Sequence, residues 1–202
     1  MICESQRIQE LTPSLFNSQF FDSPAWPRLQ SCYAPRAYHN LTHIRELCDR
    51  FNESTTPNNL WINQEAAYLA ILYHDAETNE SKSAQFMRAE VDGLFSSECL
   101  HLATMLILTK RAGPITGDAA LFVDIDHAIV GSAPERYQEY RDAIAEEYSA
   151  VPSWLFRKER ARFLLGLARE QYLYRTEFFR EQREAQAFAN IQGELKDLDV
   201  RL

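Results

Sequence analysis

The chain has 202 residues, of which 46% are hydrophobic and 12% aromatic, and its formal net charge is −8. This length and composition are typical of one folded globular domain and exclude an intrinsically disordered chain. The acidic balance excludes a protein that holds the nucleic-acid backbone through a basic face, so we expect no nucleic-acid duplex as a partner.

The four cysteines are widely separated and form no Cys-x-x-Cys pair, which argues against a zinc ribbon or a disulfide framework. Residues 1–10 lack a cationic start followed by an apolar run, so we expect no signal peptide. The apolar runs are too short and interrupted to span a bilayer. We therefore expect a cytoplasmic protein without a membrane partner.

Apolar residues recur at helical spacing along the whole chain, and no stretch alternates for long enough to predict a strand. We predict an all-α fold, a single-domain helical bundle that covers residues 1–202. The expected helices span residues 4–17, 24–33, 42–51, 62–75, 82–95, 97–110, 119–130, 134–148, 154–168 and 172–198.

The helix expected at 62–75 has an apolar face that should pack into the core, and it delivers His74 and Asp75 side by side at its end. Both side chains are ligands for a divalent cation, and the partial negative charge at the C-terminal end of a helix favours one. A histidine at a helix end can instead be a cap or a satisfied core residue. The pair by itself therefore does not decide between these interpretations.

Two further histidines precede that helix. Thr42 can cap the helix expected at 42–51, which places His43 in its first turn and His39 just before it. Because Asn40 and the cap lie between the two histidines, their spacing of four does not ensure that they share a face.

The helix expected at 119–130 is apolar on every side apart from Asp124, Asp126 and His127. An ionised carboxylate inside a buried helix costs several kcal/mol unless it is paired or bound to a cation. A cation site is one explanation for the two aspartates. An ion pair with Arg136 or Arg141 is the other, and the residues alone leave both open.

In chain order, His43, the His74-Asp75 pair and an aspartate near residue 125 form the pattern H…HD…D. With this pattern the chain resembles the HD superfamily of metal-dependent phosphohydrolases, in particular a small bacterial group of HD-domain phosphohydrolases. The matching segments follow the family's order over about residues 35–195 and are PRAYHNLTHI (35–44), YHDA (73–76), NESKSA (79–84), ILT (107–109), DAALFVDIDHAIVG (118–131), YRDAIAEEY (140–148) and FANIQGEL (188–195).

The resemblance implies an all-helical HD-type domain in which His43, His74, Asp75 and one of the two aspartates hold a divalent metal ion. By the family's pattern Asp126 is the better match for the fourth ligand, and Asp124 is the second choice. Two imidazoles and two carboxylates suit Mn, Fe, Co, Ni or Zn, and Mg also remains open.

The resemblance also implies an enzyme, a phosphohydrolase that acts on a small phosphorylated substrate such as a nucleotide. Phosphate-ester hydrolysis needs a Lewis acid and a water activated at neutral pH, and one metal ion can supply both. We expect Asp75 to be a ligand and the base for the attacking water, with Glu80 as a further acid or base and Glu77 in a solvated turn. His39 would orient a neighbouring group. A homodimer is compatible with this interpretation.

Several polar positions of the family's pattern differ in this chain. Residues 109–112 lack the expected histidine, and Ala145 and Phe188 stand where arginines are expected. Each change removes a group that could touch a substrate. A non-catalytic, metal-binding helical interaction module is therefore the first alternative.

A second alternative is a di-iron carboxylate bundle. Glu98-x-x-His101 and Asp124-x-x-His127 each place a carboxylate three residues before a histidine on an expected helix. Two such motifs and one further carboxylate from each of two other helices form the di-iron site of ferritin-like proteins. The two further carboxylates are not identifiable from the sequence.

Overall fold

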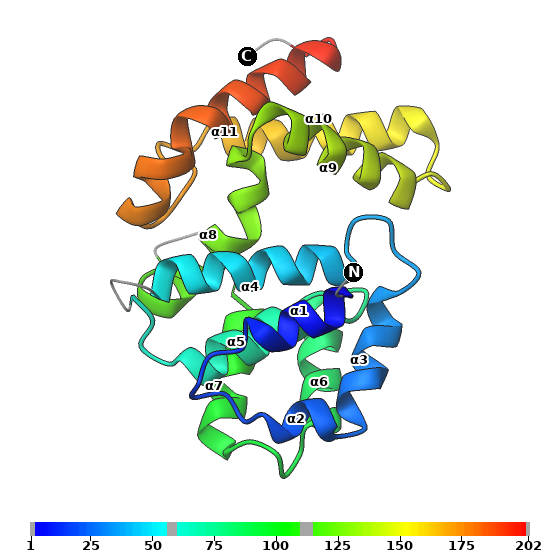
Figure 1. The fold of residues 1–202 in the computed structure, drawn as a ribbon. Helices are drawn as coiled ribbons and strands as arrows, with labels where there is room; N and C mark the ends of the chain where they lie inside the picture. The colour runs from blue at the N-terminus through cyan, green and yellow to red at the C-terminus, as the bar shows by residue number, and fades with distance from the viewer. Residues whose placement is uncertain (1–2, 56–59, 110–114, 201–202) are drawn as a thin grey trace. The chain divides into compact units, whose positions relative to one another are not determined.

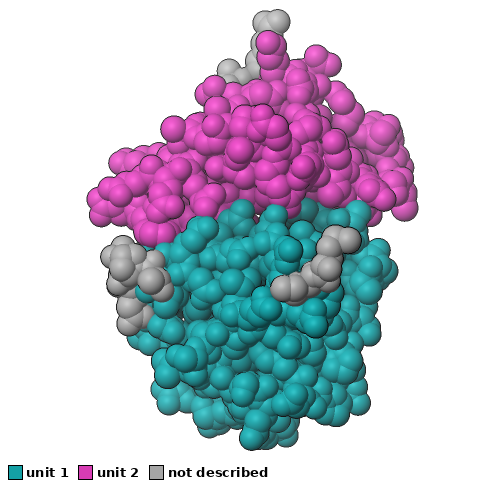
Figure 2. Space-filling view, in the orientation of Figure 1, with its two compact units in different colours: residues 1–125 teal, residues 126–202 magenta. Residues whose placement is uncertain are grey.

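The computed structural model describes residues 3–55, 60–109 and 115–200. Within these ranges all regular structure is helical, with eleven α-helices, one 3₁₀ helix and no strand (Figure 1). The prediction of an all-α helical bundle is confirmed. The chain divides into two compact units, residues 1–125 (unit 1) and 126–202 (unit 2), which Figure 2 colours separately. The expectation of a single domain stays a prediction.

Unit 1 is built around one buried helix. Every residue of α5 from Ala66 to Tyr73 is buried, and α5 packs against α4, α6 and α7. A helix that is apolar on all sides is stable only inside a core. The helices that begin in unit 1 are α1 (Glu4–Glu10), α2 (Gln19–Asp22), α3 (Ala25–Tyr33), α4 (Leu41–Thr55), α5 (Gln64–Tyr73), α6 (Glu80–Glu90), α7 (Ser97–Ile107) and α8 (Gly117–His127).

The starts of α5 and α8 are joined by hydrogen bonds. The side chain of Asn63 caps α5 by accepting a hydrogen bond from the amide of Ala66 at 2.9 Å. The Asp118 carboxylate, in the first turn of α8, accepts hydrogen bonds from the amides of Ile62 and Asn63 at 2.7 and 2.8 Å. These bonds fix the two helices that carry the His-Asp pair and the two aspartates relative to each other.

The residue that caps the start of α4 lies two positions before the one that the sequence analysis predicted. The side-chain oxygen of Asn40, not Thr42, accepts hydrogen bonds from the amides of Thr42 at 2.8 Å and His43 at 3.3 Å. Asparagine and threonine are both good caps, so the choice between them depends on the path of the preceding loop. His43 nevertheless lies in the first turn of α4, as expected.

Other helix boundaries also differ from the sequence analysis. The helix expected at 172–198 begins only at Glu177, because Thr176 has an extended backbone and its side chain caps the helix by accepting a hydrogen bond from the amide of Phe179. The Glu184 carboxylate holds the segment before the cap by accepting hydrogen bonds from the amides of Leu173 and Tyr174 at 2.6 and 3.1 Å. The helix expected at 4–17 ends at Glu10. The helix expected at 97–110 ends at Ile107, and Lys110 lies outside the described residues.

Unit 2 contains a buried ionic network that joins three helices. Arg160 donates to the Glu194 carboxylate at 2.8 and 3.0 Å and to the Tyr140 hydroxyl at 2.7 Å, and Tyr137 donates to Glu194 at 2.6 Å. Burial acts to lower the pKa of Arg160, but Glu194 and Tyr140 outweigh it and raise that pKa, so the guanidinium stays charged. The elements of unit 2 are η1 (Ala128–Gly131), α9 (Pro134–Glu147), α10 (Ser153–Ala168) and α11 (Glu177–Asp197).

The final residue of η1, Gly131, lies against α11. A Cβ atom at this position would be 2.6 Å from the Tyr174 hydroxyl oxygen and 2.7 Å from the carbonyl oxygen of Arg183. The carbonyl is part of the α11 backbone, so it cannot rotate away as a side chain does.

None of the helices in the described ranges combines the length and the hydropathy needed to cross a bilayer.

We expect Gly131→Ala to destabilise the protein by about 1–3 kcal/mol, because the added methyl group forces η1 away from α11. Gly166→Ala in α10 is the matched control, since a Cβ there meets no atom within 4 Å. That change should be neutral or stabilising by about 0.5–1 kcal/mol, because alanine is the better helix former. Urea unfolding of both variants measures the difference, and equal free energies of unfolding would contradict the close approach.

Candidate metal centre

Four side chains from three helical segments come together in the structure. His43 of α4, His74 and Asp75 at the end of α5, and Asp126 of α8 each offer a ligand atom, and these atoms lie within 4.8 Å of one another. Both histidines are buried and both aspartates are half-buried. These four residues could hold a metal ion, and the group is named the metal centre as a candidate site.

The orientation of His74 is fixed by the backbone of its own helix. Its Nδ1 lies 2.9 Å from the carbonyl oxygen of Ile71, so we assign the proton to Nδ1. Nε2 is then the basic nitrogen, and it lies 3.0 Å from Oδ2 of Asp75. Nε2 of His43 lies 3.9 Å from the same oxygen, and the two imidazole centroids are 5.6 Å apart. Both imidazoles therefore converge on Asp75.

Two side chains hold the main chain at the end of α5. The Tyr33 hydroxyl donates to the Leu72 carbonyl at 2.8 Å, and the Arg36 guanidinium donates to the carbonyls of Asp75 and Ala76. Burial, followed by the negative charge of Asp75, raises the pKa of Tyr33 well above its usual value, so the phenol stays protonated and keeps donating. The sequence analysis assigned no role to Tyr33 or Arg36, because bonds to backbone carbonyls leave no side-chain pattern.

His39 lies beside the metal centre without belonging to it. Its Nε2 is 3.7 Å from Oδ2 of Asp75, and its ring packs edge-on against His43 with centroids 5.7 Å apart. Its side chain is 24% exposed, whereas that of His43 is 2% exposed. This placement is compatible with the expectation that His39 orients a neighbouring ligand.

The remaining candidate residues from the sequence lie outside the group of four. Asp124 is fully buried on α8 but is not one of the four residues. Glu80 is exposed at the first position of α6, and Glu77 is half-buried with its amide donating to Ser83 at 3.0 Å. The fourth-ligand role of Asp124 and the acid–base role of Glu80 therefore stay predictions without geometric support.

The residues of the di-iron alternative do not gather around this group. Glu98 and His101 are exposed on α7, and neither belongs to the metal centre. His127 lies 3.7 Å from Asp126 through Nδ1, and its ring stacks on Phe163. A di-iron site needs four carboxylates, and the metal centre has two. Across residues 3–55, 60–109 and 115–200, no second group of three or more such side chains has ligand spacing.

The donor set fits one divalent cation. Two neutral imidazoles and two carboxylates carry a formal charge of −2, which a divalent ion balances, and mixed nitrogen and oxygen ligands suit transition metals. Ligand bonds of about 2.1 Å place opposite ligand atoms about 4.2 Å apart, so the observed spread of up to 4.8 Å requires shifts of only a few tenths of an ångström. The metal identity stays open.

Comparisons of this chain with protein-family models, with curated proteins and with solved structures return no match. The resemblance to the HD superfamily therefore stays a prediction. So do the nucleotide-like substrate, the cytoplasmic location and the homodimer. Function has to be inferred from the metal centre and the residues around it.

We expect the purified protein to bind one divalent ion per chain and His74→Ala to lose it, because Nε2 of His74 is one of the four ligand atoms and lies 3.0 Å from Oδ2 of Asp75. Elemental analysis by mass spectrometry measures the metal content. His101→Ala on α7 is the control, since its exposed side chain lies outside the group, and it should keep the metal. Full metal content in His74→Ala would contradict the ligand assignment.

Proposed function

We propose that this protein is a metal-dependent hydrolase of a small phosphorylated substrate. The observation that carries the proposal is the convergence of two imidazoles and two carboxylates from α4, α5 and α8. The order of these residues along the chain, which resembles the HD superfamily, supports the same reaction class.

His43, His74, Asp75 and Asp126 would hold the ion. When bound, a divalent cation polarises a phosphoryl oxygen and lowers the pKa of a water that becomes the nucleophile. Four protein ligands already complete the coordination sphere of an ion that prefers tetrahedral geometry, such as zinc. Ions that accept six ligands, such as Mn or Mg, therefore fit a catalytic role better than zinc.

Asp75 is the residue of this centre best placed to accept a proton. A carboxylate has two oxygens, so one can serve as a ligand while the other takes the proton of the attacking water. His39, 3.7 Å from Oδ2 of Asp75, restricts the orientation of that carboxylate from the more exposed side. Arg36 fixes the backbone of the same residue through the Asp75 carbonyl. Asp75 is therefore held at both its side chain and its main chain.

We expect Asp75→Asn to lower phosphate release by about 100-fold or more, because the amide cannot accept the proton and is a weaker ligand. The assay is inorganic phosphate released from nucleoside monophosphates and from p-nitrophenyl phosphate, with Mn, Co, Ni and Mg added in turn. If the wild-type protein binds metal but releases no phosphate from any of these substrates, the proposal that it is a hydrolase is wrong. That result would favour the non-catalytic metal-binding module.

We expect His39→Ala to lower kcat by about 10- to 100-fold while the metal content stays at the wild-type level, as is typical of residues that orient a ligand. His39→Gln should recover part of the loss, because its side-chain amide offers an N–H group toward Asp75. Parallel measurements of kcat and metal content separate this role from ligation. Loss of the metal in His39→Ala would instead make His39 a ligand.

A further inference from the structure

Arg36, three residues after the end of α3, binds the main chain that carries Asp75. Its guanidinium donates hydrogen bonds to the carbonyl oxygens of Asp75 and Ala76, the second at 3.5 Å, and its central carbon lies 5.9 Å from the ring centroid of Tyr33. Within residues 3–55, 60–109 and 115–200 it forms no ion pair with a carboxylate. The hydrogen bonds of this charged group are therefore directed at main-chain oxygens.

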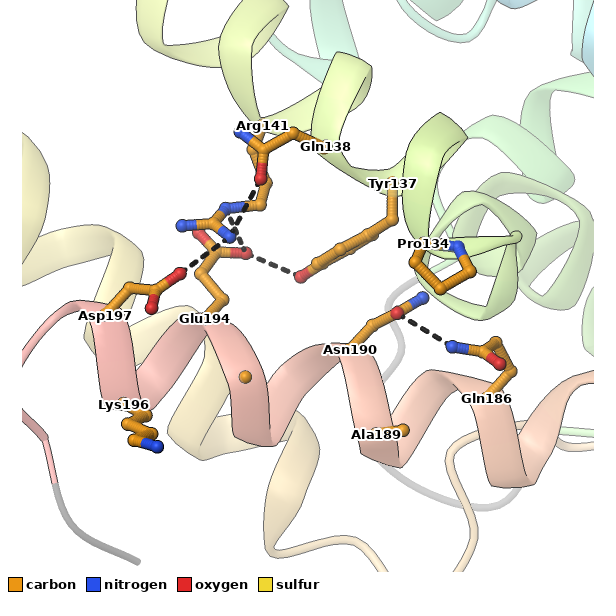
Figure 3. A pocket seen from close by; sticks show the side chains of 11 residues that line it. Pro134, Tyr137, Gln138, Arg141, Gln186, Ala189, Asn190, Glu194, Lys196 and Asp197 are labelled. Atoms are coloured by element: carbon orange, nitrogen blue, oxygen red, sulfur yellow. Dashed lines mark hydrogen bonds and ion pairs between the residues drawn. The ribbon is translucent and has the colours of Figure 1, made fainter.

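Other arginines of this chain have carboxylate partners. Arg141 of α9 pairs with Asp197 at 2.9 Å and with Glu194 at 3.8 Å (Figure 3). In such pairs the opposite charges balance each other. Because Arg36 has no partner of this kind in the described part of the chain, charge balance does not explain its position. The requirement of the end of α5 for hydrogen-bond donors does explain it.

The last carbonyl groups of a helix have no partner within the helix, so they need donors from elsewhere. At the end of α5 these donors can be identified. The Leu72 carbonyl accepts a hydrogen bond from the Tyr33 hydroxyl at 2.8 Å, and the Tyr73 carbonyl accepts one from the amide of Ala76 at 3.1 Å. Arg36 supplies the donors for the next two bonded carbonyls along the chain. The main chain is thus held for several residues beyond the helix.

The position of the Asp75 backbone matters because its carboxylate lies close to both imidazoles. Oδ2 of Asp75 is 3.0 Å from Nε2 of His74 and 3.9 Å from Nε2 of His43. The ligand atom of Asp126 lies within 4.8 Å of the same group, and two carboxylates so close repel each other when no cation lies between them. A backbone that Arg36 holds limits how far Asp75 can move in response to this repulsion.

We propose that Arg36 is a positioning residue of the metal centre, which keeps the ligand set preformed by fixing the backbone of Asp75. A preformed site loses less conformational freedom when a cation binds, so it binds the cation more tightly. The positive charge of Arg36 acts in the opposite direction, because it repels a nearby cation. The positional effect is the larger, because the rigid guanidinium binds two carbonyls at once. This role depends on the metal centre of the proposed function and not on hydrolysis.

Isothermal titration of metal-free protein with Mn²⁺, without substrate, tests this role. We expect Arg36→Met to weaken the affinity for Mn²⁺ by about 10- to 100-fold, the usual effect of removing a residue that orients a ligand. Urea unfolding of the same samples shows that the variant is folded under the conditions of the titration. A purely structural role would lower the free energy of unfolding and leave the affinity of the folded protein unchanged.

Arg36→Lys separates position from charge and is the milder variant if Arg36→Met does not fold. Lysine keeps the positive charge, but its single ammonium group lacks the planar array of donors that binds two carbonyls together. We expect Arg36→Lys to recover part of the affinity that Arg36→Met loses and to remain about three- to tenfold weaker than the wild type.

Arg45→Met is the matched control. Arg45 lies on α4 two positions after His43, so it points to nearly the opposite side of that helix. Its side chain is 21% exposed and pairs with Glu4 at 2.8 Å and with Asp49. Loss of these ion pairs should lower the stability slightly and leave the affinity for Mn²⁺ at the wild-type value.

The possible results separate this role from the proposed function. If the wild type binds Mn²⁺ and folded Arg36→Met binds it equally well or more tightly, the positioning role is wrong and the metal centre stands. Wild-type affinity in Arg36→Lys would likewise overturn the role, because the bond to two carbonyls would then not be needed. If the wild type binds no Mn²⁺, both the metal centre and the role of Arg36 are wrong.

Discussion

The burial of α5 is the constraint on which the metal centre depends. Because close-packed neighbours surround this helix on every side, it cannot rotate or slide without disturbing the whole core of unit 1. Its last residues are therefore delivered to one place. Tyr33 and Arg36 then bind the carbonyls at this helix end, so the backbone that carries His74 and Asp75 is held after the helix itself has stopped.

Carboxylates that are buried or half-buried have two different explanations in this protein. In unit 2, Glu194 is balanced by Arg160 and Tyr137 on neighbouring helices, and its burial requires no ligand. At the metal centre, Asp75 and Asp126 instead converge with two imidazoles. A buried acid is therefore a weak indication of a metal site, whereas an acid that shares its surroundings with histidine nitrogens at ligand spacing is a much stronger one.

Local patterns predicted the helices better than their ends. The helix expected at 24–33 is observed at Ala25–Tyr33, because apolar spacing is a property of the segment itself. The end of the loop before α4 was placed wrongly, since Asn40 and Thr42 are both suitable capping residues. The start of α11 was also placed wrongly, since Thr176 caps the helix there and the Glu184 carboxylate holds the preceding segment through the amides of Leu173 and Tyr174. Such bonds depend on tertiary contacts and not on periodicity.

The sequence by itself determined the all-helical class and the order of the candidate ligands, because both depend on residue type and spacing. Only the tertiary structure decided which aspartate joins them. Asp124 and Asp126 are two positions apart on one helix and so point in nearly opposite directions, and the packing of α8 selects Asp126. The pairing of Arg141 with Asp197 was likewise decided by folding, since it joins helices that the sequence leaves far apart.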